Sequence, residues 1–259
     1  MTSRRDRGTL LAVLATAALS LAVGGCASRG KPLVSSASRD QTTRYNLARV
    51  YLDQGKVQES IQQLNELLDM APRHAEGHNL LGLAHWSVGR HTEARAEFER
   101  ALEINPYFSD ARVNLGVVHS EEGRFAEADQ EFQKVLEDKT YPTPEKPLVN
   151  LAVNRIKQGQ PARALEEAER AIRRNPRYTR AYDVFVQAVR SSERGGAGPE
   201  YRALLRDMDR SIEFHVNLAD AFLKENEVRR ARAHLQRVVA LDPEGEQGTR
   251  ARQTLEKLP

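Results

Sequence analysis

Histidine side chains are the groups in this sequence that could most directly bind a metal or transfer a proton near neutral pH. The 259 residues include seven of them, and His78, His85 and His119 fall on neighbouring segments of helical character. The sequence has no His-Glu-x-x-His run, no Gly-rich phosphate loop and no Gly-x-Ser-x-Gly turn. We therefore expect these histidines to serve packing, and we expect no enzyme activity, no metal and no cofactor beyond a covalent lipid.

Cys26 is the only cysteine, which excludes an intramolecular disulfide. It follows three arginines in the first seven residues, an apolar stretch over residues 9–23 and two glycines. A basic start, a short apolar segment and small residues before a cleavage site are typical of a secretory signal. The apolar stretch is shorter than the ~20 residues that a membrane-spanning helix needs. The sequence therefore predicts export of the chain.

The Gly24-Gly25-Cys26 ending resembles the bacterial lipobox, in which the cysteine becomes the lipidated first residue of the mature protein. This resemblance implies that residues 1–25 are a lipoprotein signal peptide and that Cys26 carries a covalent lipid such as palmitate. Ala27, in place of an aspartate, implies sorting to the outer membrane, where the lipid anchors the protein. The alternative is an ordinary secretory signal in which Cys26 has no role.

Residues 26–40 are polar and contain Gly, Pro and four Ser, and they predict a flexible tether. With an r.m.s. length of roughly 5–6 Å × √n, the 14 residues after the cysteine reach about 20 Å.

The charge of the whole chain is +3, but residues 1–25 contribute +2 of it. This removes the main argument for nucleic acid as a partner.

The remaining charge is divided along the chain. Residues 41–144 carry 11 basic and 17 acidic side chains, a net charge of −6, whereas residues 145–259 carry 22 and 17, a net charge of +5. The division indicates either solvated helix faces or a polarised scaffold that presents different surfaces to different partners.

From Gln41 the sequence repeats itself about every 34 residues. Pro72 and Pro106 are 34 residues apart, and a Leu-small pair such as Leu81-Gly82 occupies positions 7 and 8 of every unit except the fifth. Glycine recurs at the same spacing where a first helix must stop, at Gly55, Gly89, Gly123 and Gly159. This pattern resembles the tetratricopeptide repeat (TPR) family over residues 41–243.

The resemblance predicts an all-α, right-handed superhelical TPR solenoid of about six helix-turn-helix repeats with a C-terminal capping helix. Small residues at positions 8, 20 and 27 of each unit let two helices approach, and a proline at position 32 ends the second helix. The expected units are 41–74, 75–108, 109–142, 145–178, 179–211 and 212–243, with a cap at 244–259. The fifth unit is degenerate, because the glycine-rich run from Gly195 to Gly198 replaces its tight turn.

The first helices of a TPR solenoid line its concave face, where positions 2, 5, 6, 9, 12 and 13 point into a groove. The expected groove residues are Asn46, Arg49, Leu52, Asn79, Leu83, Trp86, Val113, Asn114, Val117, Val149, Asn150, Val153, Ile156, Lys157, Val216, Asn217, Asp220 and Leu223. Those of the second to fourth units are largely apolar and include Trp86, the only tryptophan. We therefore expect an apolar peptide or strand as the ligand, rather than an acidic carboxyl terminus in a Lys/Arg-rich clamp or a small-molecule substrate.

Asparagine occupies position 6 in four units, at Asn46, Asn114, Asn150 and Asn217. Its amide can both donate to and accept from the backbone of an extended peptide. The other interpretation is hydrogen bonding between helices of the solenoid, and the sequence leaves both open.

A signal, a short tether and six repeats resemble the outer-membrane pilotin lipoproteins of type IV pili, the PilF/PilW/Tgl family. The most specific match is Lys139-Thr140-Tyr141-Pro142 between the third and fourth units, followed by an Asn-Leu pair at Asn150-Leu151. Ala152 departs from the family pattern, which has Gly there. The resemblance implies binding to the pilus secretin and promotion of its localisation and multimerisation for pilus assembly and twitching motility.

Two other functions are compatible with the same sequence. One is a generic periplasmic TPR adaptor for another envelope complex. The other is a TPR-containing envelope enzyme or cell-wall factor, which the absence of a catalytic motif disfavours.

Overall fold

The computed structural model describes residues 36–192 and 199–259, and every regular element in these ranges is a helix. The helices are α1 (Ser36–Asp53), α2 (Val57–Met70), α3 (Ala75–Ser87), α4 (His91–Ile104), α5 (Ser109–Glu121), α6 (Phe125–Glu137), α7 (Glu145–Lys157), α8 (Pro161–Arg174), α9 (Thr179–Ser191), α10 (Pro199–Met208), α11 (Ile212–Lys224), α12 (Val228–Leu241) and α13 (Glu246–Lys257). The predicted signal peptide, Cys26 and the Gly195–Gly198 turn lie outside the described residues. None of the described helices is both long and apolar enough to cross a membrane.

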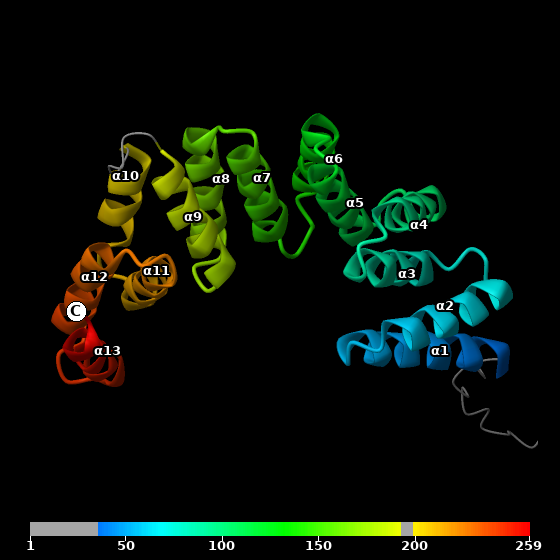
Figure 1. The fold of residues 1–259 in the computed structure, drawn as a ribbon, viewed down its shortest axis with the longest axis horizontal. Coiled ribbons are helices and arrows are strands. Elements are labelled where there is room, and N and C mark those ends of the chain that lie inside the picture. The colour runs from blue at the N-terminus through cyan, green and yellow to red at the C-terminus, as the bar shows by residue number, and fades with distance from the viewer. Residues whose placement is uncertain (1–35, 193–198) are drawn as a thin grey trace, which may run out of the picture.

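The helices follow one another along an arc (Figure 1). Consecutive helices pack as pairs except in the fifth unit, where α10 packs on α8. Helices α3, α5 and α11 lie toward the inner side of the arc, with α4, α6 and α12 outside them. The C-terminal helix α13 packs against α12 and covers the end of the last pair. This arrangement confirms the prediction of an all-α TPR solenoid with a C-terminal capping helix.

The chain becomes helical earlier than predicted. Helix α1 begins at Ser36, so assigning residues 36–40 to the tether was wrong. An ion pair supports this first part of the helix locally: Arg44 Nε lies 3.3 Å from a carboxylate oxygen of Asp40. The hydroxyl of Thr42 donates to the carbonyl of Ser38 at 2.9 Å. An acidic residue four positions before a basic one is the favourable order on a helix.

The tight turns inside the pairs use residues in the left-handed region of backbone space. The predicted turn glycines Gly55, Gly89, Gly123 and Gly159 have φ angles of +73°, +75°, +77° and +69°. The sixth pair has Asn226 at the corresponding position, with a φ of 59°. Asparagine is one of the few residues with a side chain that tolerate this conformation, so the same turn forms without glycine.

Inside the second and third pairs, a glycine of the first helix lies directly against a phenylalanine ring of the second. A Cβ atom at Gly82 would come within 2.6 Å of Phe98, and one at Gly116 within 2.6 Å of Phe132. Both rings are buried. The first pair has Ala48 at the glycine position, and the residue corresponding to the phenylalanine is the smaller Leu64; both belong to one core cluster.

The last repeats are joined by a buried chain of hydrogen bonds. The Tyr201 hydroxyl of α10 lies 2.9 Å from Nε2 of His234 in α12, and His234 Nδ1 lies 2.9 Å from Nδ1 of His215 in α11. His215 Nε2 lies 3.1 Å from the carbonyl oxygen of Asp209. One assignment satisfies every group: Tyr201 donates to His234, His234 donates to His215, and His215 donates to the carbonyl, with both imidazoles neutral.

Burial lowers the pKa of His234 to about 3, and the adjacent His215 contributes in the same direction. Burial also lowers the pKa of His215, as well as those of His85 in α3 and His119 in α5. A proton added to His215 would place two N–H donors against each other, and one added to His234 would force the Tyr201 hydroxyl to accept instead of donate. The folded protein therefore resists protonation of these rings, whereas the unfolded chain does not.

Replacement of Gly116 by alanine tests the close contact inside the third pair. At an exposed helix position, alanine stabilises the helix by about 1 kcal/mol relative to glycine. At position 116, however, the Cβ of alanine would collide with Phe132. We expect Gly116→Ala to lower the free energy of unfolding by about 1–3 kcal/mol. The double variant Gly116→Ala/Phe132→Leu copies the Ala48–Leu64 pair and should recover most of this loss in urea unfolding. A Gly116→Ala variant more stable than the parent would contradict the assignment.

The histidine chain predicts acid sensitivity. The pKa of His234 is lower in the folded state than in the unfolded chain, so its stabilising effect is complete above about pH 6.5 and is lost as the pH falls from there toward about 3. Each proton taken up only on unfolding lowers the free energy of unfolding by about 1.4 kcal/mol per pH unit. Urea unfolding of His234→Gln should therefore show a shallower pH dependence between pH 7 and 5 than the parent. A pH dependence of His234→Gln equal to that of the parent would refute the role of His234.

Candidate binding groove

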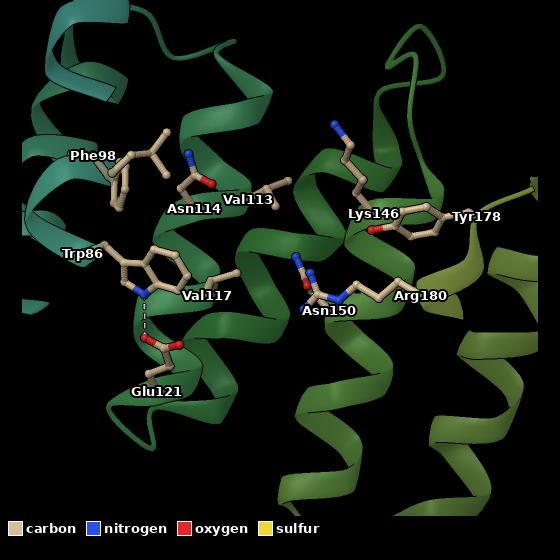
Figure 2. Close-up of a pocket in the computed structure, with 11 residues that line it drawn as sticks. Trp86, Phe98, Val113, Asn114, Val117, Glu121, Lys146, Asn150, Tyr178 and Arg180 are labelled. Carbon is tan, nitrogen blue, oxygen red and sulfur yellow. Dashed lines mark hydrogen bonds between the residues drawn. The ribbon is translucent and has the colours of Figure 1, made fainter. Parts of the chain in front are cut away.

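An open cavity of about 340 Å³ lies on the solenoid where α3, α5, α7 and the start of α9 face one another. Six of the predicted groove residues line it: Leu83, Trp86, Val113, Asn114, Val117 and Asn150. Five further residues complete the lining: Phe98, Glu121, Lys146, Tyr178 and Arg180. We call this cavity the central groove, and Figure 2 shows its lining side chains.

Trp86 forms one side of the central groove. Its side chain is 38% exposed, so it lies at the surface of the groove and not in the core. Its indole Nε1–H donates to a carboxylate oxygen of Glu121 at 2.6 Å, and His91 Nδ1 lies 3.3 Å from the same oxygen (Figure 2). The hydrogen bond fixes the plane of the indole, so a large apolar surface is held ready for a ligand.

Apolar side chains of α3 and α5 form the floor beside the indole. Leu83 and Val117 are half-buried, and Val113 is almost completely buried. The Phe98 ring closes the floor from α4 and is 1% exposed. Because these side chains pack into the core clusters of the second and third pairs, the floor is rigid and apolar.

The opposite wall comes from α7 and from the start of α9 and is basic. Lys146 and Arg180 are exposed and line the groove together with Asn150 and Tyr178. Figure 2 shows Lys146 beside Tyr178, with Arg180 extending in the direction of Asn150. The expectation of a largely apolar groove was therefore incomplete, because positive charge borders the apolar floor.

The apolar strip predicted along the fourth unit is not open to a ligand. Val149 is 0% exposed and belongs to one core cluster with Tyr182 and Phe185 of α9, so its assignment to the groove was wrong. Val153 and Ile156 are half-buried and pack against the same cluster. The reason is that α7 packs directly against α9.

The other expected groove residues lie away from the central groove. Asn46 and Arg49 are exposed on α1, and Lys157 is exposed at the end of α7. The sixth-unit residues Val216, Asn217, Asp220 and Leu223, and Leu52 of the first unit, are also outside its lining.

Two of the four position-6 asparagines follow the interpretation of hydrogen bonding within the solenoid. Asn114 Nδ2 donates to Asn79 Oδ1 at 2.9 Å, which links α5 to α3, and Asn217 Nδ2 donates to the carbonyl oxygen of Pro176 at 3.1 Å. These bonds hold the solenoid together. Asn150 lines the central groove, where its amide faces the space available to a ligand.

The Tyr-Pro junction connects the two walls of the groove. Tyr141 is 9% exposed and shares a core cluster with Val113 of α5 and Leu151 of α7. Its hydroxyl donates to a carboxylate oxygen of Asp110 at 2.9 Å, and burial raises its pKa to about 12. The junction therefore fixes α5 and α7 relative to each other.

Three groove residues that were overlooked occupy positions that the repeat rule identifies as inward-facing. Lys146 and Arg180 are at position 2 of the fourth and fifth units, and Glu121 is at position 13 of the third. The prediction took only some of the inward-facing positions of each unit, and it left these three out although it kept Lys157 at position 13 of the fourth unit. Tyr178 precedes α9, and Phe98 belongs to a second helix, so the rule for first helices identifies neither.

Comparison with known proteins agrees with this architecture. Two family models described as tetratricopeptide repeat match the chain, one at residues 45–108 and 149–182 and the other at residues 85–142. The chain is a tetratricopeptide-repeat protein. TPR proteins act as protein-interaction scaffolds, which is the kind of function that an open groove on a helical solenoid supports. No curated protein sequence matches the chain significantly.

Solved TPR structures share the fold at low sequence identity. PilF of Pseudomonas aeruginosa aligns with a TM-score of 0.59 and 20% identity over 85% of this chain and 100% of PilF. PilW, described as a widely conserved type IV pilus biogenesis factor, gives a TM-score of 0.58 and 18% identity over 84% and 97% of the two chains. MamA gives a TM-score of 0.52 and 15% identity over 73% and 95%. At these identities the similarity establishes the fold alone.

Proposed function

We propose that this TPR protein is a pilotin-like lipoprotein of the outer membrane. It binds a subunit of the type IV pilus secretin in the central groove and promotes the localisation and multimerisation of that secretin. The observation that carries the proposal is the central groove itself, in which the only tryptophan of the chain stays exposed above a rigid apolar floor. Exposed aromatic side chains beside an apolar pocket are typical of protein-binding sites.

Two further observations support this function. The alignment with PilF and PilW extends over most of this chain and nearly all of each of theirs, including the helices that form the groove. The lipobox-like ending at Cys26 supports a lipid anchor. Nine residues separate Cys26 from the first residue of α1, and nine residues span at most about 32 Å even when fully extended. A lipid on Cys26 would therefore keep the solenoid close to the membrane.

Secretin assembly provides the test of the groove. Deletion of the gene should abolish heat-resistant secretin multimers on gels, and Trp86→Ala/Val117→Glu should do the same, because it removes the indole and places a charge on the apolar floor. Co-purification with the secretin should fall at least tenfold while the circular dichroism spectrum stays helical. Tyr107→Ala, which removes an aromatic side chain that is 91% exposed and outside the groove, is the matched control. Normal multimers in the deletion strain would refute the pilotin function and leave the adaptor for another envelope complex.

Membrane fractionation tests the anchor separately. Cys26→Ser removes the thiol that accepts the lipid, and we expect the variant to move from the membrane fraction to the soluble periplasmic fraction. A Ser28→Ala variant, which alters the residue two positions later, should stay with the membranes. A Cys26→Ser protein that still sediments with outer membranes would exclude lipidation as the means of attachment.

A further inference from the structure

The basic wall of the central groove indicates which ligand chemistry fits there. We propose that the groove recognises an internal, extended protein segment in which an apolar residue is followed closely by an aspartate or glutamate. Trp86 and Val117 bind the apolar side chain, and Lys146 and Arg180 bind the carboxylate. This inference rests on the proposed function, because it specifies the segment that the same groove binds.

The first step of the argument is the unpaired state of the two cations. Within residues 36–192 and 199–259, neither Lys146 nor Arg180 has a carboxylate within ion-pair distance. Basic side chains nearby are paired: Arg155 lies 2.6 Å from Asp129, and Arg112 lies 2.8 Å from Glu131. Two unpaired positive charges on one wall of a cavity favour an anionic group between them.

The second step concerns the direction in which a segment binds. The carboxylate of Glu121 already accepts the indole N–H of Trp86 and lies close to His91, so negative charge is fixed on the α3 and α5 side. A ligand carboxylate is repelled there and attracted to Lys146 and Arg180. An apolar side chain finds the floor of Leu83 and Val117 only beside the indole. These constraints place the apolar residue at Trp86 and the acidic residue at the α7–α9 wall.

The third step concerns the ligand backbone. Asn150 and Tyr178 line the groove between and beside the two cations, and both carry groups that can donate and accept hydrogen bonds. Asn150 can therefore satisfy the backbone of an extended segment at the transition from the apolar floor to the basic wall. The groove is an open cavity at the surface, so the chain can enter and leave it, and recognition does not require a free carboxyl terminus.

The test measures binding of the detergent-solubilised secretin subunit to the full-length lipoprotein. We expect Lys146→Glu/Arg180→Glu to weaken binding at least tenfold. The neutral variant Lys146→Gln/Arg180→Gln should weaken it less and should flatten its decrease between 50 and 300 mM NaCl, which a merely structural effect would not do. Arg229→Glu/Lys257→Glu makes the same charge change at exposed sites far from the groove and should bind like the parent. All variants should keep the parent's helical circular dichroism.

The outcomes separate this inference from the proposed function. Loss of binding for Trp86→Ala/Val117→Glu with unchanged binding for the charge-reversed variant would overturn the inference and leave the proposed function intact. Unchanged binding for both variants would overturn both the inference and the proposed function.

Fifteen-residue peptides spanning the secretin sequence provide the second measurement, with Trp86 fluorescence as the readout. The bound peptide should contain Asp or Glu beside an apolar residue and should lose at least tenfold in affinity when that acid is replaced by its amide. A bound peptide that needs a free terminal carboxylate would overturn the inference.

Discussion

The contact between a small residue of one helix and a large residue of the next is the constraint on which the whole solenoid depends. Phe98 and Phe132 occupy the space that a side chain at Gly82 or Gly116 would need. The helices of a pair can therefore pack closely enough to bury these rings, and the next pair stacks on the resulting ridge. Glycine faces phenylalanine in these pairs, and alanine faces leucine in the first pair. In these three pairs the residue on the second helix is larger where the one on the first helix is smaller, whereas the fourth pair has alanine at both positions, Ala152 and Ala168.

This dependence on local volume and turn chemistry explains why most of the fold could be predicted from the sequence. A glycine at four of the tight turns and a proline after the second helix of every unit except the fifth are local signals, and they repeat in register. The signals fail where structure depends on something else. The start of α1 at Ser36 depends on side-chain bonds within a polar segment that has no apolar periodicity. The turn at Asn226 needs only a residue that tolerates positive φ, and a search for glycine misses it.

The groove could be predicted less well, because it depends on how neighbouring repeats sit against each other. The rule of inward-facing positions assumes that every repeat has the same geometry. The fifth unit breaks that assumption: it has Val186 where the other units have Gly or Ala, and its second helix α10 packs on α8. Helix α9 lies against α7 and buries Val149, which closes the groove on that side. The same rule correctly includes Lys146 and Arg180 among the inward-facing positions. Whether such a charged side chain can bind a ligand depends on whether it is already paired within the protein, and the sequence alone does not give its partners.

The degenerate fifth unit therefore shapes the binding site as well as the core. By covering the apolar face of α7 it removes surface from the groove, and by bringing Arg180 to the rim it adds charge there. Tyr201 of α10 then ties this unit to α11 and α12 through His234 and His215, deep in a cluster that includes Phe214 and Phe222. The neutral state of both histidines suits that network, and α11 of the same region packs against α9. One core cluster therefore extends from Tyr201 and Phe222 to α9 and to Val149 of α7, beside the basic wall.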